Sequence, residues 1–168
     1  DSYGKLIPVR AELVVGDSEL GLCGMVDQLF WNEKSGELEI WDWKTNKEIK
    51  EKNKWQQFKS PLSHLDVCEL NTYSLQLSLY KHIIEKNTNL KLGSSYIVWL
   101  NENNDTYKVF KCHDFEKEVK RNIMLVNSKP KKIVLSELQH KALEEINLKF
   151  KSNNIVLFKG VTSSGKTE

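Results

Sequence analysis

The chain has 168 residues, of which 39% are hydrophobic, and this is enough for one domain with a real core plus a further fragment. Its 25 Lys and Arg against 23 Asp and Glu give a net charge of +2, so any affinity for nucleic acid must come from local basic clusters. No run approaches the roughly 20 apolar residues that span a bilayer, and three widely spaced cysteines fit neither a disulfide framework nor a zinc site. We therefore expect no membrane association and a reducing cytoplasm.

The first predicted elements are three strands. Residues 9–15 are rich in strand-forming side chains, residues 20–31 form a longer apolar run, and residues 37–45 alternate in part between apolar and charged side chains. The polar stretch 32–36, with Gly36 at its end, is typical of a hairpin loop. We expect the second and third strands to pair antiparallel.

The next stretch has no clear period. Residues 47–71 are mostly Lys, Gln, Ser and other polar residues, which predicts a long loop with at most a short helix. A helical stretch then starts at Thr72, with apolar residues at helical spacing over 73–86. Two strands follow over 95–101 and 106–112, and a second helix over 115–126. Together these elements predict a mixed central β-sheet flanked by helices, an α/β or α+β fold.

The composition changes after the second predicted helix. Proline and clustered lysines favour an interdomain linker, which we place at 128–135, so that 1–127 forms one domain. Residues 136–150 then predict a helix with a near capping box, and residues 155–159 a short apolar strand. We assign 136–168 to the start of a second domain.

Two aspartates and a lysine on the predicted hairpin carry the strongest chemical signal. A short loop makes Asn32 face Glu37. Counting back along both strands then places Asp27 opposite Asp42, and Lys44 shares the face of Asp42. Two facing carboxylates repel each other unless a cation lies between them. A hard divalent ion such as Mg²⁺ or Mn²⁺ prefers carboxylate oxygen and can bridge to a phosphate, which suits phosphodiester hydrolysis.

The role of Lys44 has two explanations at this stage. Its amine could position or deprotonate the attacking water, or it could stabilise charge that develops on the phosphoryl oxygens. Sequence leaves both open.

The segments Gly24-Met25-Val26-Asp27 and Ile40-Trp41-Asp42-Trp43-Lys44-Thr45 resemble the G-x-x-D and D-x-K motifs of the PD-(D/E)xK nucleases, in their RecB-like and phage-type branch. That branch has a Gln and a Tyr on the following helix, which Gln76 and Tyr80 match, one turn apart on one face. The resemblance covers about residues 9–127. It implies a restriction-endonuclease-like fold and a Mg²⁺-dependent deoxyribonuclease of a bacterial or phage-infected cell. Asp27 and Asp42 would bind the metal, and Gln76 and Tyr80 would face the DNA backbone.

The resemblance also implies that Glu12, on the preceding strand, supports the site or contributes a further carboxylate. Many RecB-like members supply a His from a helix before these strands, but no His precedes Glu12. Either that helix lies upstream of residue 1 or this branch lacks it. The histidines of the chain fall at positions that do not substitute for it: His64, His82, His113 and His140.

Each motif also has a simpler explanation. A D-x-K triplet occurs by chance in many exposed strands, and an inactive descendant of a nuclease could keep the whole pattern. Gln76 and Tyr80 could form a polar helix edge, and Glu12 could be an ordinary strand carboxylate. We expect the tryptophans to be core or rim aromatics rather than base-stacking platforms: Trp31, Trp41, Trp43 and Trp55.

The predicted loop after the third strand is basic. Residues 47–59 include five lysines and two glutamates. Lys50 and Lys54 could therefore contact the phosphate backbone, and such contacts would weaken as salt rises. A solvated, charge-rich loop is the alternative.

The last residues fit the phosphate-binding pattern G-x-x-x-x-G-K-[ST] after an apolar strand. Backbone amides of such a loop cradle phosphates, the lysine meets the outer phosphates of ATP, and the hydroxyl binds Mg²⁺. The residues concerned are Gly160, Gly165, Lys166 and Thr167.

This stretch and residues 135–139 resemble the start of the core of PriA-type primosomal helicases, which implies that Gln139 reads adenine. A working site of this kind needs a following helix and a distant acidic residue. The chain stops before either, so we expect a truncated P-loop segment that binds ATP only if the parent protein completes the domain.

The leading hypothesis is a Mg²⁺- or Mn²⁺-dependent DNA nuclease in replication, recombination or phage DNA processing, linked to the beginning of an ATP-dependent helicase. Its expected partners are DNA and proteins of replication or recombination. A second hypothesis is a helicase whose nuclease-like region only binds DNA. A third is a DNA-binding module without catalysis.

Overall fold

The computed structural model describes residues 4–102 and 105–127 and the short pieces 136–137, 140–141 and 144. Every helix and strand named below lies in the compact unit Asp1–Lys129. Most residues of the predicted linker and of the predicted second domain lie outside the described part, so the domain boundaries stay predictions. Among the described helices, none combines the length and the apolar character that crossing a membrane requires.

A five-stranded sheet and two helices make up this unit. The strands lie in chain order across the sheet: β1 (Leu6–Asp17), β2 (Leu22–Asn32), β3 (Glu37–Lys44), β4 (Leu92–Trp99) and β5 (Lys108–Lys111). Neighbouring strands pair antiparallel except β3 and β4, which are parallel. A parallel pair needs a crossover, and α1 (Glu69–Asn87) lies within it. The predicted mixed sheet is thus confirmed, and the arrangement is compatible with a restriction-endonuclease-like fold.

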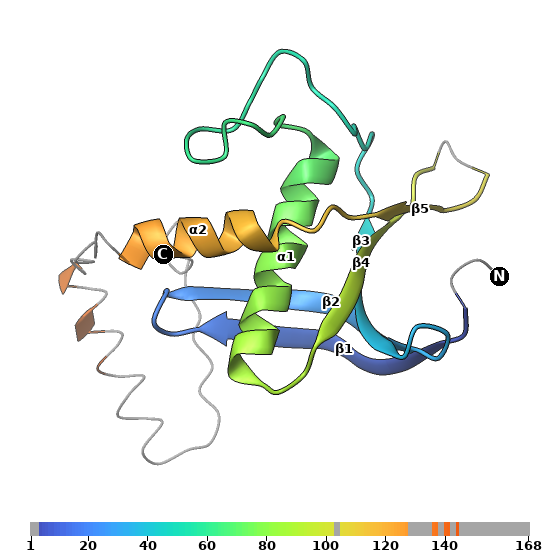
Figure 1. The fold of residues 1–168 in the computed structure, drawn as a ribbon, viewed down its shortest axis with the longest axis horizontal. Coiled ribbons are helices and arrows are strands. Elements are labelled where there is room, and N and C mark those ends of the chain that lie inside the picture. The colour runs from blue at the N-terminus through green and yellow to red at the C-terminus, as the bar shows by residue number, and fades with distance from the viewer. Residues whose placement is uncertain (1–3, 103–104, 128–135, 138–139, 142–143, 145–168) are drawn as a thin grey trace. The chain divides into compact units, whose positions relative to one another are not determined.

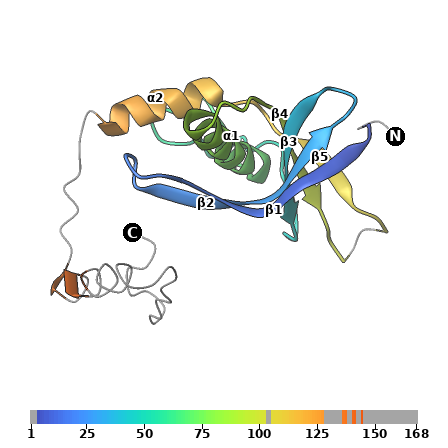
Figure 2. The ribbon, with the colours of Figure 1, turned by 90° about the horizontal axis from the view of Figure 1, so that it is seen from below.

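Both helices lie on one face of the sheet (Figures 1 and 2). The second helix, α2 (Glu116–Asn127), follows β5 and runs across α1 in Figure 1. Between β3 and α1 the chain forms the predicted long loop, which contains only one isolated bridge, between Gln57 and Asp66. Helix α1 begins at Glu69 rather than at the predicted Thr72.

The core lies between α1 and the sheet. Side chains at helical spacing on α1 meet fully buried aliphatic side chains from the strands: Leu70, Leu77, Tyr80 and Ile84 from α1, and Val26, Ile40 and Ile97 from the sheet. Full burial of one such aliphatic side chain contributes about 1.5–3 kcal/mol. This layer therefore fixes α1 over the centre of the sheet.

Two buried serines on α1 hold the chain that connects β5 to α2. Ser74 Oγ accepts a hydrogen bond from His113 N at 3.0 Å, and Ser78 Oγ accepts one from Phe115 N at 3.0 Å. Residues four apart lie on the same side of a helix, so both serines face this connection. The hydroxyls satisfy these two backbone N–H groups, and the connection to α2 is held against α1 as a result.

Candidate metal and nucleic-acid site

The β2–β3 hairpin sets the register of the candidate site. Asn32 O accepts a hydrogen bond from Gly36 N at 2.8 Å, and Gly36 has φ 70°, a left-handed conformation that favours glycine. This turn makes Asn32 pair with Glu37, as predicted. The pairing continues as far as Gln28 and Trp41.

Asp27 and Asp42 are the next residues along these two strands, where β2 and β3 separate. Beyond them β2 pairs only with β1, and β3 pairs only with β4. Figure 1 shows β1 and β2 extending together away from β3 and β4. Asp27 Oδ2 accepts a hydrogen bond from Trp43 N at 2.9 Å, in place of a bond between the strands. We call this place the fork; both aspartates lie here, although the strands separate before the predicted pair of Asp27 with Asp42 can form.

Asp42 is buried in the fork. Its side chain is 3% exposed, and its Oδ2 lies 2.5 Å from Lys44 Nζ. Within the described part of the chain that oxygen has no hydrogen bond of normal geometry, so the contact with Lys44 is a close ion pair rather than a directed bond. Burial raises the pKa of the Asp42 carboxyl, the nearby charge of Asp27 raises it further, and Lys44 only partly offsets these effects.

This donor set fits a hard divalent cation. The described residues contain no group of three or more His, Cys, Asp or Glu side chains that could hold a metal ion, so the fork offers two carboxylates at most. Mg²⁺ commonly uses one or two carboxylates and takes its other ligands from water and phosphate. Asp27 and Asp42 match that pattern, and Oδ2 of Asp42, which has no hydrogen bond of normal geometry, has the Lys44 ammonium as its ionic partner.

Lys44 is held from α1 as well as from its own strand. Its Nζ lies 4.6 Å from the centre of the Tyr73 ring, which places the ammonium over the ring face. Tyr73 OH donates a hydrogen bond to Asn46 Oδ1 at 2.8 Å, and Trp99 Nε1 donates one to Asn46 O at 2.7 Å. The sequence motifs did not identify Tyr73 or Asn46, because no motif position corresponds to either residue.

Gln76 and Tyr80 lie on the same face of α1 as Tyr73. Gln76 Nε2 donates a hydrogen bond to Tyr80 OH at 2.8 Å. The Tyr80 ring packs directly on Gly24, where an added Cβ would come within 2.3 Å of Tyr80 Cε1. Gly24 is therefore needed to admit this ring. Since Tyr73 contacts Lys44 and Tyr80 contacts Gly24, Gln76 lies between them on the side of α1 that faces the fork.

Glu12 lies beside the fork on β1. Counting from the pair Leu13 and Val26 places Glu12 opposite Asp27, although the two form no regular pair. Glu12 has φ 48°, a conformation that costs energy in any residue with a side chain, so β1 is locally irregular here. Its side chain is exposed and forms no hydrogen bond or ion pair with another described residue. Its part in the site stays a prediction.

A buried thiol also lies near the fork. Burial raises the pKa of Cys112 to about 12, and the charge of Asp42 raises it further, whereas a hydrogen bond with Ser74 lowers it. A thiol in this state does not act as a nucleophile near neutral pH. The chemistry of the fork therefore depends on the carboxylates and on Lys44.

The described histidines do not supply the missing catalytic group. His64 Nε2 lies 3.3 Å from Glu118 Oε1, and the backbone N of His113 is bonded to Ser74. In the part of the chain that the structure describes, no histidine is bonded to an aspartate of the fork.

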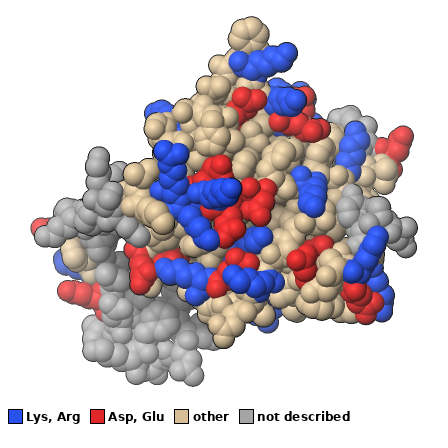
Figure 3. Space-filling view, in the orientation of Figure 1, with Lys and Arg blue, Asp and Glu red and all other residues tan. Residues whose placement is uncertain are grey.

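The basic loop leaves the fork side of β3. Lys50 and Lys54 are exposed, and Lys50 Nζ lies 3.4 Å from Glu48 Oε2, so their contact with DNA stays a prediction. Acidic and basic side chains are interspersed over the face in Figure 3.

The expectation for the tryptophans is right in three cases and wrong in one. Trp41 is buried at 5% exposure, and Trp31 and Trp43 are rim residues at 39% and 43%. Trp55 is 96% exposed, so it belongs neither to the core nor to its rim. Its exposure follows from the path of the loop, which its own sequence does not reveal.

The predicted nucleotide-binding residues lie outside the described residues: Gln139, Gly160, Gly165, Lys166 and Thr167. The P-loop assignment therefore rests on sequence alone.

The sequence model of the PD-(D/E)XK nuclease superfamily matches residues 2–154 of the chain. The match includes every residue of the fork and also the residues of α1 that face it. It runs past residue 127, the predicted end of the first domain. A comparison with curated proteins finds no match.

Proposed function

The chain belongs to the PD-(D/E)XK nuclease superfamily, and from this premise we propose that it is a DNA nuclease that hydrolyses phosphodiester bonds with Mg²⁺ or Mn²⁺. The observation that carries the proposal is the fork. It combines a buried Asp42 oxygen without a directed hydrogen bond, a second carboxylate from Asp27 and the ammonium of Lys44. A fully structural carboxylate would have its hydrogen bonds satisfied.

Asp27 and Asp42 would hold the metal ion in this proposal. When bound there, a divalent ion supplies positive charge that offsets the negative charge which the phosphate gains during cleavage. The bond from Trp43 N keeps one oxygen of Asp27 in place, so the carboxylate needs little reordering to bind.

Lys44 acts on the phosphate or on the attacking water. An ammonium group has three donors, and its charge pairs with that of Asp42. Its donors can bond to a phosphoryl oxygen or orient the water that attacks phosphorus. The Tyr73 ring keeps the ammonium beside Asp42 and so pre-orders it for this task.

Gln76, Tyr80 and Glu12 have supporting roles in the proposal. Gln76 is half-buried and presents its amide on the face of α1 toward the fork, where it can contact the DNA backbone. Tyr80 was predicted to face the DNA as well, but it is buried against Gly24, so it would hold Gln76 in place rather than contact DNA itself. Glu12 lies across the ribbon from Asp27 and would help to hold the metal ion or its water. We place the activity in DNA replication, recombination or phage DNA processing, and we keep the helicase link as a proposal from the P-loop residues.

The test is cleavage of labelled single- and double-stranded DNA with Mg²⁺ by the full chain and by Asp42→Ala and Lys44→Ala. We expect both variants to lose at least about a hundredfold in rate, because each removes charge stabilisation at the phosphate. Asp105→Ala is the matched control, since Asp105 is an exposed acid distant in sequence from the fork, and it should cut normally. Equal cleavage by all four proteins would overturn the assignment.

Two other outcomes identify the alternatives. A helicase with a DNA-binding nuclease fold shows no cleavage, and it loses ATP binding in Lys166→Ala. A DNA-binding module without catalysis binds DNA equally well with and without divalent ions.

A further inference from the structure

The long loop between β3 and α1 ends on both sides next to the fork. We call residues 47–66 the arm. At its start, Asn46 is bonded to Tyr73, which packs on Lys44. At its base, Lys50 O accepts a hydrogen bond from Leu70 N at 3.1 Å, so the first part of the arm is tied to the beginning of α1. Whatever the arm binds is therefore held close to the catalytic groups.

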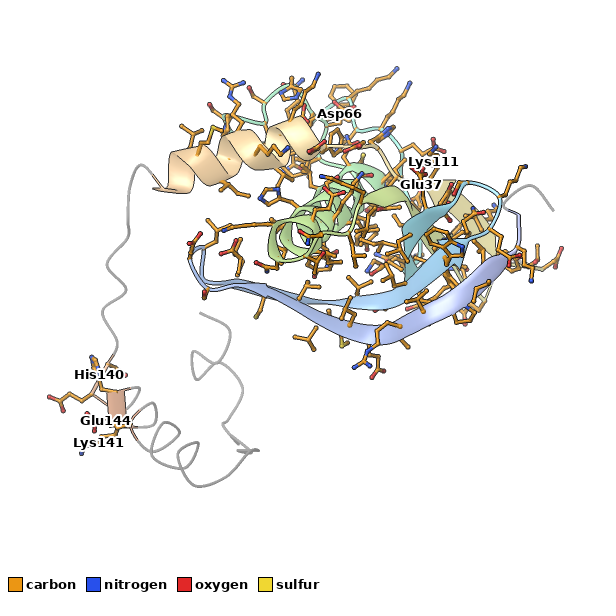
Figure 4. The ribbon with its side chains drawn as sticks, turned by 60° about the horizontal axis from the view of Figure 1, so that its bottom comes forward. Glu37, Asp66, Lys111, His140, Lys141 and Glu144 are labelled. Atoms are coloured by element: carbon orange, nitrogen blue, oxygen red, sulfur yellow. The ribbon has the colours of Figure 1, made fainter. Side chains whose placement is uncertain are left out.

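The arm is internally ordered around Asn53. Asn53 Nδ2 donates to Val67 O at 2.8 Å, and Asn53 N donates to Asp66 Oδ2 at 3.3 Å. Asp66 is labelled in Figure 4. Asn53 Oδ1 in turn accepts a hydrogen bond from Trp55 N at 3.0 Å. The backbone of Trp55 is thus fixed in a turn, although its side chain touches almost nothing.

Trp55 is presented to solvent by this ordered turn. At 96% exposure it leaves more of its side chain in water than any other large apolar side chain in the described part of the chain. Leaving an indole in water forgoes the burial that normally stabilises such a side chain. An ordered backbone with a free indole costs little further ordering when a flat partner binds.

The arm also carries positive charge. Lys52 and Lys54 flank this turn, and Lys59 follows; all three are exposed, and none forms an ion pair with another described residue. A hollow of about 830 Å³, lined in part by Thr45, Lys47 and Tyr107, opens at the base of the arm. Lys47 and the acidic Glu102 both line this hollow, which leaves room for a strand to pass from the fork toward the lysines of the arm.

We propose that the arm binds single-stranded DNA, with Trp55 stacking on an unpaired base and the lysines contacting the flanking phosphates. Bases in a duplex are already stacked on both faces, so a lone exposed indole can stack only on a base that is unpaired or displaced. The arm thus gives the chain a preference for single strands or for frayed ends. This inference rests on the proposed function, because it takes DNA as the substrate.

The first test measures binding apart from cleavage. Fluorescence anisotropy of labelled oligonucleotides is recorded with the full chain carrying Asp42→Asn, without divalent ions. Adding Trp55→Ala should weaken binding to a single strand by about 5- to 100-fold, the range for losing one stacked base. Binding to a covalently closed circular duplex should change by less than about twofold, because no base face is free to stack.

Controls separate stacking from loss of any exposed apolar side chain. Trp55→Phe keeps a ring and should retain most of the single-strand affinity. Met124→Ala removes a side chain that is 71% exposed on α2 and should leave both affinities unchanged. An oligonucleotide with abasic sites should bind wild type and Trp55→Ala alike. Equal effects of Trp55→Ala on single strand and duplex, or no effect on either, would overturn the proposal; the second result would point to a protein partner for this surface.

The lysines have a separate signature. Lys52→Ala with Lys54→Ala should lower the slope of log affinity against log salt by about 0.7 for each phosphate of a single strand that is no longer neutralised. An unchanged slope would show that Lys52 and Lys54 do not contact the phosphates of the bound strand.

The outcomes distinguish this inference from the proposed function. If the chain cuts DNA but Trp55→Ala does not weaken its binding to a single strand, only the inference about the arm is refuted. A chain that never cuts, but whose single-strand binding depends on Trp55, refutes the nuclease proposal alone.

Discussion

Strand β3 buries two carboxylates, Glu39 at 3% exposure and Asp42 at 2%. They lie three residues apart on the strand and therefore on opposite faces. Glu39 accepts hydrogen bonds from Asn32 Nδ2 at 2.9 Å and from Trp41 Nε1 at 3.1 Å. Asp42 faces α1, where its Oδ2 meets only the ion pair with Lys44 among the described residues.

The hydrogen bonds of these two acids distinguish a structural carboxylate, Glu39, from a candidate functional one, Asp42, on the same strand. Both oxygens of Glu39 are engaged, and the Trp41 ring that donates to it stacks on Tyr96 with centroids 4.6 Å apart. That network needs no further ligand. In the fork, Oδ2 of Asp42 instead has no hydrogen bond of normal geometry, and its ionic partner is Lys44. A second acid, Asp27, lies close enough for its charge to act on Asp42. Burial alone therefore does not mark a catalytic acid; unmet capacity for a cation does.

The largest expected difference between the two acids is in cleavage. Asp42→Asn keeps the shape but removes a charged ligand, so the rate should fall at least about 1,000-fold, or about 4 kcal/mol in the barrier. Glu39→Gln, measured per folded molecule, should change the rate by less than about threefold, because Glu39 faces away from the fork. Initial rates with Mg²⁺ check both. A Glu39→Gln enzyme as inactive as Asp42→Asn would abolish the distinction.

Glu39→Gln should reduce the stability of the fold, although it should hardly change the cleavage rate. In Glu39→Gln the new amide offers one acceptor where Asn32 and Trp41 both donate, so one buried donor loses its partner. The free energy of unfolding should fall by about 1–3 kcal/mol. Urea unfolding followed by circular dichroism measures it. Unchanged stability would mean that the network of Glu39 contributes nothing to the fold.

The effect of Asp42 on stability should depend on pH. Folding raises the pKa of this carboxyl above its ordinary value of 3.8, mainly through burial. The stability that it contributes is thus complete below the unfolded pKa and is lost as pH rises through the folded pKa. Asn cannot ionise, so Asp42→Asn should be more stable than wild type at neutral pH, and its advantage should vanish below about pH 3.8.

Unfolding in urea at several pH values, with a chelator present, measures this advantage. Glu39→Gln serves as the control and should show no gain at neutral pH. An advantage of Asp42→Asn that grows in acid would contradict the prediction. Adding Mg²⁺ should stabilise the wild type and leave Asp42→Asn unchanged, because the ion meets the charge that burial penalises.

The smallest effect concerns the ring beneath Lys44. Tyr73→Leu removes the cation–π contact, which is worth about 0.5–1 kcal/mol at a partly exposed site, so the cleavage rate should fall about two- to fivefold. Tyr73→Phe keeps the ring and should retain the rate, with an unchanged KM in both variants. If Phe is as slow as Leu, the bond to Asn46 and not the ring holds Lys44 in place.

Local chemistry explains why the fork was predictable from sequence. Asn32 and Gly36 determine the turn, the turn determines the register, and the register brings Asp27 and Asp42 to the same place. Each of these steps depends on residues near each other in the chain, and period-two alternation along the strands does the rest.

The features that escaped prediction depend on distant contacts or lack a local signal. Helix α1 begins three residues early because Cys68 caps it without a side-chain bond, so no Ser, Thr, Asp or Asn marks its start. Tyr73 meets Lys44 only after the crossover brings α1 back over the sheet. The network of Glu39 and the exposure of Trp55 likewise follow from tertiary packing, which no spacing of residues along the chain encodes.

The double attachment of the arm has a consequence for how such proteins diversify. Asn46 at one end and Glu69 at the other, where it accepts the N–H of Lys50, are fixed to the framework that carries the fork. The segment between these points can become longer or shorter, or change in sequence, without moving Asp27 or Asp42. Proteins that share one ancestor can thus differ in the arm, which would select single-stranded DNA, while the residues of the fork that would cleave it stay the same.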